Sequence, residues 1–140
     1  MKVKIKKLFK DAVLPKQAKQ GDAGIDLTVH RIIKKSLFKI EYGFGVAMEL
    51  PPNTYADLRP RSSIHKFWML LSNSCGVADE GYRGEYKAVF YKIPFLSTPY
   101  KVGERAIQMI LKNYHPVEFV ETNNLSESER GEGGYGSTNK

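Results

Sequence analysis

Alternation of apolar and polar residues with a period of two is the feature that most constrains this chain. Apolar side chains recur at every second position in five segments, which are residues 3–5, 25–29, 38–50, 54–58 and 107–111. This period is typical of half-buried β-strands. Glycine, proline and asparagine cluster between these segments, as at Gly21-Asp22 and Pro51-Pro52-Asn53, and indicate short turns. The pattern predicts an all-β protein: a sandwich, a jelly roll or a small barrel.

One short helix is expected among the strands. Ser62 and Ser63 are typical helix-capping residues, and the apolar residues Ile64, Phe67, Trp68 and Leu71 follow at helical spacing. The sequence therefore predicts a helix that begins at these serines.

The length of the chain, 140 residues, is that of a single domain. Such a domain buries roughly 68–70% of the surface of its unfolded chain and needs no disulfides to be stable. Low-complexity sequence begins near Asn123, so we expect a β domain over residues 1–125 and a flexible glycine-rich arm over residues 126–140.

Cysteine content and hydropathy bear on the compartment. Cys75 is the only cysteine, which rules out an intramolecular disulfide, and the longest apolar run covers only residues 67–71. We expect a soluble cytoplasmic protein without membrane association.

The net charge favours an anionic ligand without identifying it. Lysine and arginine number 22 against 15 acidic residues, a formal charge of +7. This excess fits nucleic acid, a membrane surface or a small polyphosphate. The lysines are spread along the chain rather than forming a block, which weakens the nucleic-acid interpretation.

The last eleven residues combine phosphate-binding side chains with glycines. Arg130 is a forked cation, Ser137 and Thr138 are hydroxyl donors, and Tyr135 has a face on which a base can stack. The P-loop pattern fails here, because Gly136 precedes Ser137 rather than lysine and no helix can follow. We expect the segment to act as a mobile lid over a nucleotide.

Two internal segments carry polar residues suited to phosphate. In residues 22–27, Gly24 allows close backbone approach and Asp26 places a carboxylate on the strand face opposite Ile25 and Leu27. In residues 60–66, a proline-fixed turn brings Arg61 and two serines to the start of the expected helix, where spare N–H groups bind anions.

Two further segments carry a candidate base and a candidate amide ligand. Residues 73–85 are expected to form a hairpin with Glu80-Gly81 at its tip, and Asp79 beside that turn is the candidate general base. In residues 103–109, Arg105 is expected to share a face with Ile107 and Met109, which leaves Gln108 on the other face.

These segments, taken in order, resemble the five motifs of the trimeric dUTP diphosphatases (dUTPases). The matching stretches are residues 23–27, 60–63, 76–84, 103–108 and 130–138, which span nearly the whole chain. The resemblance implies a distorted jelly roll of the β-clip type and a homotrimer with shared active sites. It also implies that the arm of one subunit closes over a site formed by its neighbours.

The resemblance also implies a reaction. An enzyme of this family hydrolyses dUTP to dUMP and diphosphate by attack of water on the α-phosphorus, which limits uracil incorporation into DNA and supplies dUMP for dTMP synthesis. By the match, Asp79 positions and activates the water, and Tyr82 packs under the sugar and excludes a 2′-OH. The uracil contacts fall on Asn73, Gly76, Val77, Ala78 and, by stacking, Tyr135.

The remaining implied roles concern phosphate and metal. The phosphate ligands would be Arg61, Ser62, Ser63, Gln108, Arg130, Gly136, Ser137 and Thr138. Mg²⁺ would bind mainly through the phosphates and waters, with Asp26 contributing indirectly through water.

Four residues depart from the family pattern, and none of them removes a catalytic group. Ser63 stands where glycine is common, Ala78 where isoleucine is usual, Tyr135 where phenylalanine is frequent and Asn139 where glycine often follows.

Two alternatives stay open. One is a dCTP deaminase of the same fold, which shares an Arg-Ser-Ser loop, and the other is a non-catalytic regulatory or nucleic-acid-binding module, supported by the +7 charge. Stable nucleic-acid binding is not expected. The histidines and Cys75 show no metal-ligand spacing.

Overall fold

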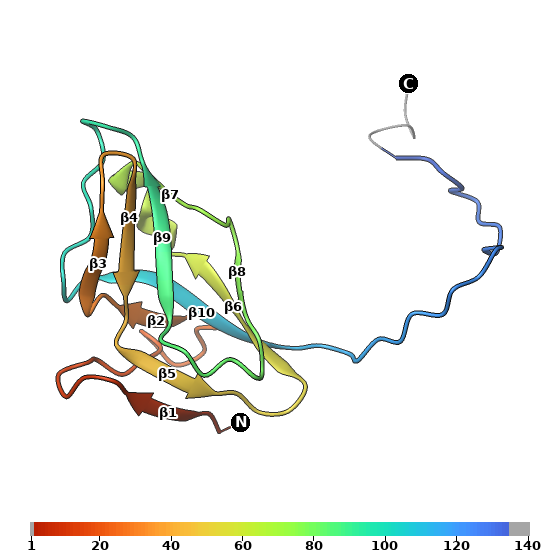
Figure 1. Ribbon diagram of the computed structural model, residues 1–140, viewed down its shortest axis with the longest axis horizontal. Coiled ribbons are helices and arrows are strands. Elements are labelled where there is room, and N and C mark those ends of the chain that lie inside the picture. The colour runs from red at the N-terminus through yellow and green to blue at the C-terminus, as the bar shows by residue number, and fades with distance from the viewer. Residues whose placement is uncertain (1, 135–140) are drawn as a thin grey trace.

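The computed structural model describes residues 2–134, which form ten β-strands and one 3₁₀ helix (Figure 1). The elements are β1 (Lys4–Lys7), β2 (Ile25–Thr28), β3 (Arg31–Lys35), β4 (Lys39–Gly43), β5 (Val46–Glu49), β6 (Thr54–Pro60), η1 (Ser62–Phe67), β7 (Met69–Leu71), β8 (Gly76–Ala78), β9 (Lys87–Lys92) and β10 (Arg105–Asn113). The all-β prediction is confirmed.

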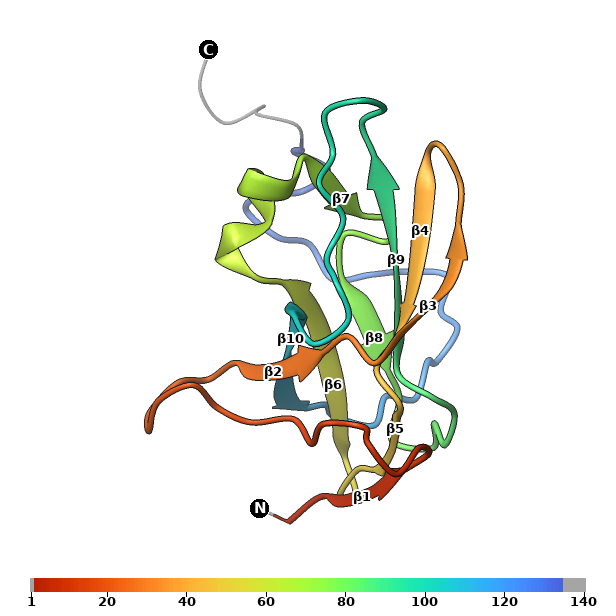
Figure 2. The ribbon, with the colours of Figure 1, turned by 90° about the vertical axis from the view of Figure 1, so that its left-hand side faces the viewer.

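The strands form two four-stranded sheets and one two-stranded sheet, all antiparallel. Their orders are β2-β10-β6-β8, β3-β4-β9-β7 and β1-β5. Figure 2 shows the two larger sheets as separate layers, with η1 at the end of β6. Both sheets stay open at their edge strands, so β8 and β7 each have a strand on one side only.

The core lies between the larger sheets and is built around aromatic side chains. Tyr42, Phe90 and Tyr100 are at most 2% exposed and meet edge to face at centroid distances of 5.8–6.1 Å. The Tyr42 hydroxyl donates to the carbonyl of Tyr100 at 3.1 Å, which satisfies a buried polar group. The apolar face of the other sheet adds Leu27 and Ile107, both fully buried.

The long alternating run over residues 38–50 forms two strands rather than one. β4 and β5 belong to different sheets, and the chain bends between them at Gly45, which has φ 68°. A side chain at this position would also contact Ala12 Cβ at 2.8 Å, so glycine is required for both conformation and space. Alternation continues across the bend because both halves contribute buried residues to the same core.

The predicted helix exists, but its type and capping were wrong. It is a 3₁₀ helix of six residues, and Arg61 rather than a serine occupies the N-cap without a side-chain capping bond. Trp68 adopts the left-handed conformation and ends the helix, so Trp68 and Leu71 fall outside it. The expectation that spare N–H groups at this turn bind an anion stays a prediction.

The hairpin expected over residues 73–85 was also wrong. The Glu80-Gly81 turn is present, with the Tyr82 N–H donating to the Asp79 carbonyl at 3.0 Å. The flanking strands diverge, however, because β8 pairs with β6 while β9 pairs with β4 and β7. Tyr86 directs the chain to the other sheet through backbone bonds with Phe44 at 3.1 Å and Val46 at 2.9 Å.

The segment after β10 leaves the sheets. Tyr114 bonds to Asn53 through its backbone N–H at 3.0 Å, and the chain then extends away from the domain (Figure 1). Val117, Phe119, Val120 and Leu125 are 67–94% exposed along this stretch. The domain boundary at residue 125 stays a prediction. Within residues 2–134, no helix has the length and apolar character required to span a membrane.

Candidate active site

Asp26 is the centre of a cluster of charged side chains on β2. It is 7% exposed and accepts one bond from Arg61 Nε at its Oδ1 and one from Arg105 Nη1 at its Oδ2, both at 2.8 Å. Its backbone N–H donates to the carbonyl of Lys16 at 2.9 Å. Two guanidinium groups around one carboxylate leave a net charge of +1, and the charge-assisted bonds hold both arginines in place.

Arg105 reaches Asp26 because of a β-bulge. Arg105 lies opposite Thr28 and Ile107 lies opposite Leu27, so Ala106 is an extra residue in β10. The bulge turns Arg105 to the face of Asp26, and the prediction that it shares a face with Ile107 and Met109 was wrong. Arg105 had no predicted role in the site, since alternation alone places its side chain on the opposite face of the strand.

Gln108 lies directly opposite Asp26 in the same sheet. Its Nε2 donates to the carbonyl of Pro60 at 3.1 Å, which orients the side-chain amide. A Cβ added at Gly24 would overlap Gln108 Oε1 and lie 3.2 Å from its Cδ. Gly24 therefore leaves the space that the Gln108 amide occupies.

A pocket of about 340 Å³ is lined by Gly24, Asp26, Arg61 and Gln108, together with Ala18, Asp22, Ala23 and Ser62. The predicted phosphate ligands Arg61, Ser62 and Gln108 are thus brought together with Asp26, whereas Ser63 does not line the pocket. The cationic Asp26–Arg61–Arg105 group and the amide of Gln108 make the pocket suited to an anion.

A second cavity, of about 240 Å³, opens between the two larger sheets at the turn that joins β7 and β8. Asn73 and Gly76 line it with Leu58, Leu71 and Ile107. Because β8 is an edge strand, backbone groups on its outer side have no strand partner and remain available to a ligand. The predicted base-reading residues Asn73 and Gly76 therefore lie together, while Ala78 packs in the core.

Asp79 follows β8 and lines a third, wider pocket of about 550 Å³ with Tyr55, Val77 and Tyr114. The adjacent Glu80 holds this turn, because its Oε2 accepts from the backbone N–H of Asn53 at 2.7 Å and from the Tyr114 hydroxyl at 3.0 Å. Donation to Glu80 raises the pKa of Tyr114. Asp79 itself is free of such a bond among the residues that the structure describes.

Tyr82 lies at the end of the same turn. Its hydroxyl donates to the carbonyl of Glu85 at 2.8 Å, and its ring meets Tyr86 edge to face at 5.8 Å. A Cβ at Gly84 would overlap the Tyr82 ring, so this glycine allows the ring to lie on the backbone. The ring is 39% exposed and presents a flat surface.

The two groups of predicted residues are separated within one chain. Asp26 lies on β2 and Asp79 follows β8, which are opposite edges of the same sheet. Three strand spacings of about 4.8 Å put these edges roughly 14 Å apart. Among the described residues, the pockets of Asp26 and Asp79 share no lining residue.

A buried carboxylate that sequence analysis missed lies between these edges. Asp57 on β6 is 1% exposed and is bonded to Arg59 at 2.8 Å, Lys112 at 2.7 Å and the Cys75 thiol at 2.9 Å. The bond from Arg59 is the main reason that the pKa of Asp57 lies well below its usual range. Donation to Asp57 raises the pKa of the Cys75 thiol and ties the turn after Asn73 to β6.

The arm residues are only partly described. Arg130 Nε donates to the carbonyl of Gly133 at 3.0 Å, which is a local contact. Tyr135, Gly136, Ser137 and Thr138 lie outside the described residues. No cluster of three or more histidine, cysteine, aspartate or glutamate side chains with metal-binding geometry occurs in residues 2–134.

Comparison with known proteins identifies the family. The sequence model of the dUTPase family matches residues 10–139. The chain belongs to the dUTPase family. The family assignment drawn from the five motifs is thereby confirmed.

Curated dUTPases match nearly the whole chain. The deoxyuridine 5′-triphosphate nucleotidohydrolase of Clostridium kluyveri is 39% identical over 140 residues, covering 99% of this chain and 98% of the relative. That of Clostridium acetobutylicum is 41% identical over 138 residues, covering 97% and 95%. These names confirm the prediction of an enzyme of the dUTP diphosphatase class.

Solved dUTPase structures share the fold. The dUTPase of Staphylococcus bacteriophage 80alpha, described in complex with dUPNHPP, superposes with a TM-score of 0.87 at 23% identity and covers 99% of both chains. A mutant of the same enzyme superposes with a TM-score of 0.87 at 21% identity over 98% of both chains. The predicted jelly-roll-like β-clip fold is confirmed.

Proposed function

We propose that this protein hydrolyses dUTP to dUMP and diphosphate. The observation that carries the proposal is the anion pocket lined by Asp26, Arg61 and Gln108, with Arg105 bonded to Asp26, in a chain that belongs to the dUTPase family. The curated relatives are named for this reaction, and the phage relative is described with a dUTP analogue.

The anion pocket would hold the phosphates. Arg61 and Arg105 carry the positive charge, and Asp26 keeps both guanidinium groups fixed at 2.8 Å. Groups fixed before the reaction stabilise developing negative charge without a reorganisation cost. Gln108 and Ser62 add hydrogen bonds, and Arg130, Ser137 and Thr138 of the arm would complete the phosphate contacts.

Asp79 would orient and deprotonate the attacking water. It lies on a turn whose neighbour Glu80 is bonded twice, so the position of the carboxylate is supported. Tyr82 would pack under the deoxyribose, because its flat face is exposed beside Asp79. Uracil would enter the cavity at Asn73 and Gly76, where the open edge of β8 provides backbone donors and acceptors.

The protein would act as a homotrimer. The anion pocket and Asp79 lie at opposite edges of one sheet, so one chain does not bring them onto a single substrate. A neighbouring subunit would supply the missing half. The extended segment with exposed Val117, Phe119 and Val120 supports this arrangement, because these side chains find no cover on their own domain.

The residues present fit Mg²⁺ brought by the nucleotide rather than a resident protein cage. Both oxygens of Asp26 are engaged by arginines, so Asp26 would reach the metal through water. Asp22 also lines the pocket. When bound, Mg²⁺ would neutralise phosphate charge that the arginines do not reach.

Product analysis tests the function. The purified protein is incubated with Mg²⁺ and separately with dUTP, dCTP, dTTP or UTP, and the products are separated by chromatography. Conversion of dUTP alone to dUMP and diphosphate is expected, whereas dUTP appearing from dCTP would identify a deaminase. Asp79→Asn should lower turnover by roughly 10²–10⁴ and leave nucleotide binding in place.

A further inference from the structure

Eight large apolar side chains are exposed at the end of the domain where β4 begins and β9 ends. This apolar end comprises Leu37, Phe38, Trp68, Leu70, Tyr91, Ile93, Phe95 and Leu96, which are 45–99% exposed. Soluble proteins rarely leave so many apolar side chains together in solvent unless the surface binds something. In Figures 1 and 2 the turn between β3 and β4 and the loop after β9 lie side by side at this end.

The side chains form one continuous surface. Leu70 on β7, Tyr91 on β9 and Lys39 on β4 are direct neighbours across the outer face of their sheet. The backbone joins the other residues, since Lys92 N–H donates to Phe38 at 2.8 Å and Ile93 N–H to Trp68 at 3.4 Å.

The loop after β9 is built to hold an aromatic ring in solvent. Ser97 Oγ accepts from the Ile93 N–H at 2.7 Å and donates to the Trp68 carbonyl at 2.6 Å. Phe95, between these anchors, has φ 66° and is 99% exposed. A bulky residue in the left-handed region is strained, and this strain is not offset by burial of the ring.

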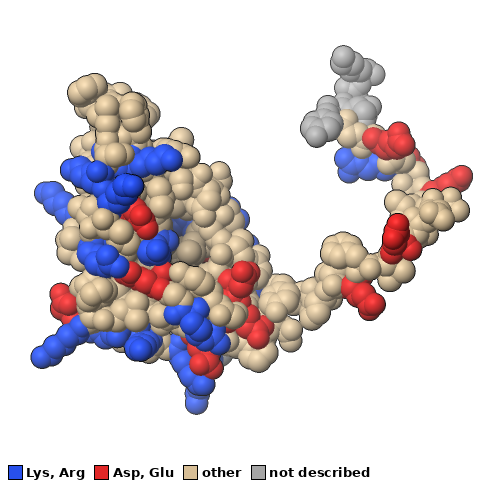
Figure 3. Space-filling view, viewed as in Figure 1, with Lys and Arg blue, Asp and Glu red and all other residues tan. Residues whose placement is uncertain are grey.

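The charge of this end has one sign. The three segments that carry its apolar side chains, residues 34–40, 66–71 and 90–98, contain five lysines and no acidic residue. The adjacent acids are already paired, Glu41 with Lys87 at 3.7 Å and Glu85 with Arg31. Figure 3 shows an uncharged tip with lysine and arginine gathered directly beneath it. Such a surface attracts an acidic partner and repels a second copy of itself.

The apolar end also adjoins an open strand edge. β7, which carries Leu70, has a strand on one side only. Its free backbone N–H and C=O groups can form hydrogen bonds with the backbone of an extended polypeptide. A lipid has no polypeptide backbone and cannot add a strand to this edge. Protein is therefore a better match than a membrane surface.

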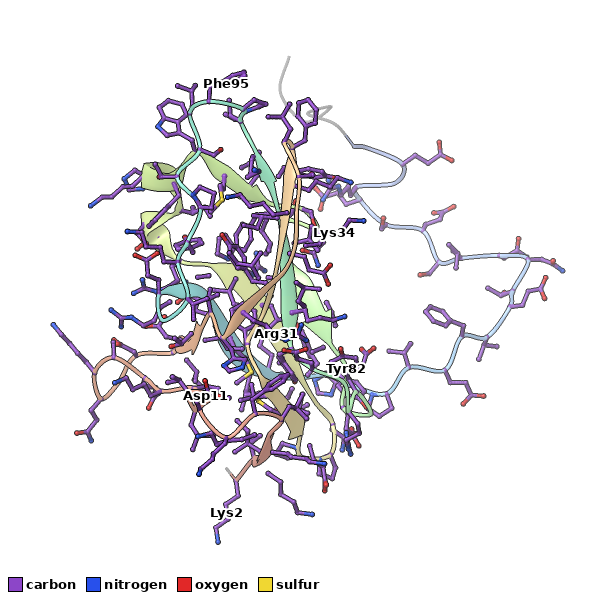
Figure 4. The ribbon with its side chains drawn as sticks, turned by 60° about the vertical axis from the view of Figure 1, so that its left-hand side comes forward. Lys2, Asp11, Arg31, Lys34, Tyr82 and Phe95 are labelled. Carbon is purple, nitrogen blue, oxygen red and sulfur yellow. The ribbon has the colours of Figure 1, made fainter. Side chains whose placement is uncertain are left out.

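We propose that the apolar end is a docking surface for a partner protein that presents an extended segment with alternating acidic and apolar residues. The apolar side chains of the segment pack on Leu70, Tyr91 and Phe95. Its carboxylates lie against Lys34 and Lys39, which share the outer face of the sheet with Tyr91, and its backbone adds to the edge of β7. Phe95 and Tyr82 lie far apart along the molecule (Figure 4), so a segment docked at Phe95 does not cover the turn of Tyr82.

Fluorescence anisotropy with labelled peptides tests this proposal on the full chain. The probe is a ten-residue peptide of alternating glutamate and leucine, and the controls are the corresponding lysine and leucine peptide and a scrambled acidic peptide. One variant combines Leu70→Ser with Tyr91→Ser, and a second combines Lys34→Glu with Lys39→Glu. Val102→Ser and Lys10→Glu are matched controls, because both residues are exposed outside the apolar end.

The acidic peptide should bind more tightly than both control peptides, and binding should weaken with salt. Each double variant should raise the dissociation constant of the acidic peptide at least tenfold, and the two control variants should leave this constant unchanged. Equal binding of all peptides, or no effect of the double variants, overturns the proposal. Binding to phosphatidylserine vesicles without peptide binding replaces it with a membrane surface. A lower assembly mass of the double variants in light scattering shows that this end is a contact between copies and also overturns it.

Discussion

Replacing Gly24 with alanine tests how the anion pocket is organised. A Cβ at this position overlaps Gln108 Oε1 and lies 3.2 Å from its Cδ, so the side-chain amide must rotate away. Rotation breaks the 3.1 Å bond from Gln108 Nε2 to the Pro60 carbonyl. The amide then no longer points where a phosphate oxygen would bind.

The expected effects on stability and activity differ in size. Loss of one neutral hydrogen bond costs about 0.5–1.5 kcal/mol, and the displaced side chain adds up to about 1 kcal/mol of rotamer strain. Gly24→Ala should therefore remain folded and lose about 1–2 kcal/mol of unfolding free energy. A hydrogen bond to a charged phosphate is worth about 1.5–3 kcal/mol, so kcat/KM for dUTP should fall roughly 10- to 150-fold.

A double-mutant cycle with Gln108→Ala identifies the cause. If alanine at Gly24 acts by displacing Gln108, it should have little further effect once the amide is gone. Steady-state hydrolysis of dUTP by the four proteins gives the coupling, and thermal unfolding confirms that each is folded. An equal loss in both backgrounds would refute the reasoning and show that Gly24 is needed for close approach of the nucleotide itself.

Substitutions at two other residues and one deletion have distinct expected effects. Arg105→Gln removes one of the two bonds that hold Asp26 and neutralises the charge of the Asp26 cluster, so kcat/KM for dUTP should fall about tenfold, and Arg105→Lys should recover part of the loss; an unchanged kcat/KM would argue against this role. The pKa of Asp57 is lowered chiefly by the bond from Arg59. The ionised carboxylate therefore stabilises the folded protein above about pH 4, which is the pKa of an aspartate in the unfolded chain, and this stabilisation is lost as the pH falls further. Asp57→Asn should lower the free energy of unfolding by about 1–2 kcal/mol at pH 7 and should lose less stability than the parent protein between pH 7 and pH 3, as urea unfolding at the two pH values would show. An equal loss of stability in acid would contradict this role of Asp57. Deleting residues from Arg130 onward should abolish most activity and leave the number of subunits in the assembly unchanged. Full activity in the shortened chain would exclude a role for the arm.

Alternation predicted several strands that face the core, but it missed β7 and β8, whose Met69, Leu71 and Ala78 are also buried. β2, β6 and β10 were found because one face of each is buried, whereas β7 and β8 are three residues long and too short for a period to emerge. Which strands pair with one another is even less accessible from local sequence patterns. The bend at Gly45 and the divergence of β8 from β9 depend on contacts between segments distant in sequence, such as those of Tyr86 with Phe44 and Val46.

The site was predicted by residue type and order, and the structure adds geometry that no local pattern contains. Arg61, Ser62, Gln108 and Asp26 were expected together and do line one pocket. Arg105 was missed because a single extra residue in β10 reverses the face on which it lies. Asp57 was missed because its partners Lys112 and Cys75 come from other strands and turns.

The division of the predicted residues between opposite edges of one sheet has a consequence for dosage. If each complete site draws on more than one chain, catalysis depends on the concentration of assembled protein, and specific activity should fall on dilution below the dissociation constant of the assembly. A chain defective at Asp79 would still contribute its anion pocket to a neighbour. In a mixed assembly, the two halves of each site would come from different chains. A chain defective at Asp79 and a chain defective in the anion pocket could therefore together form some complete sites and restore activity that neither chain has alone.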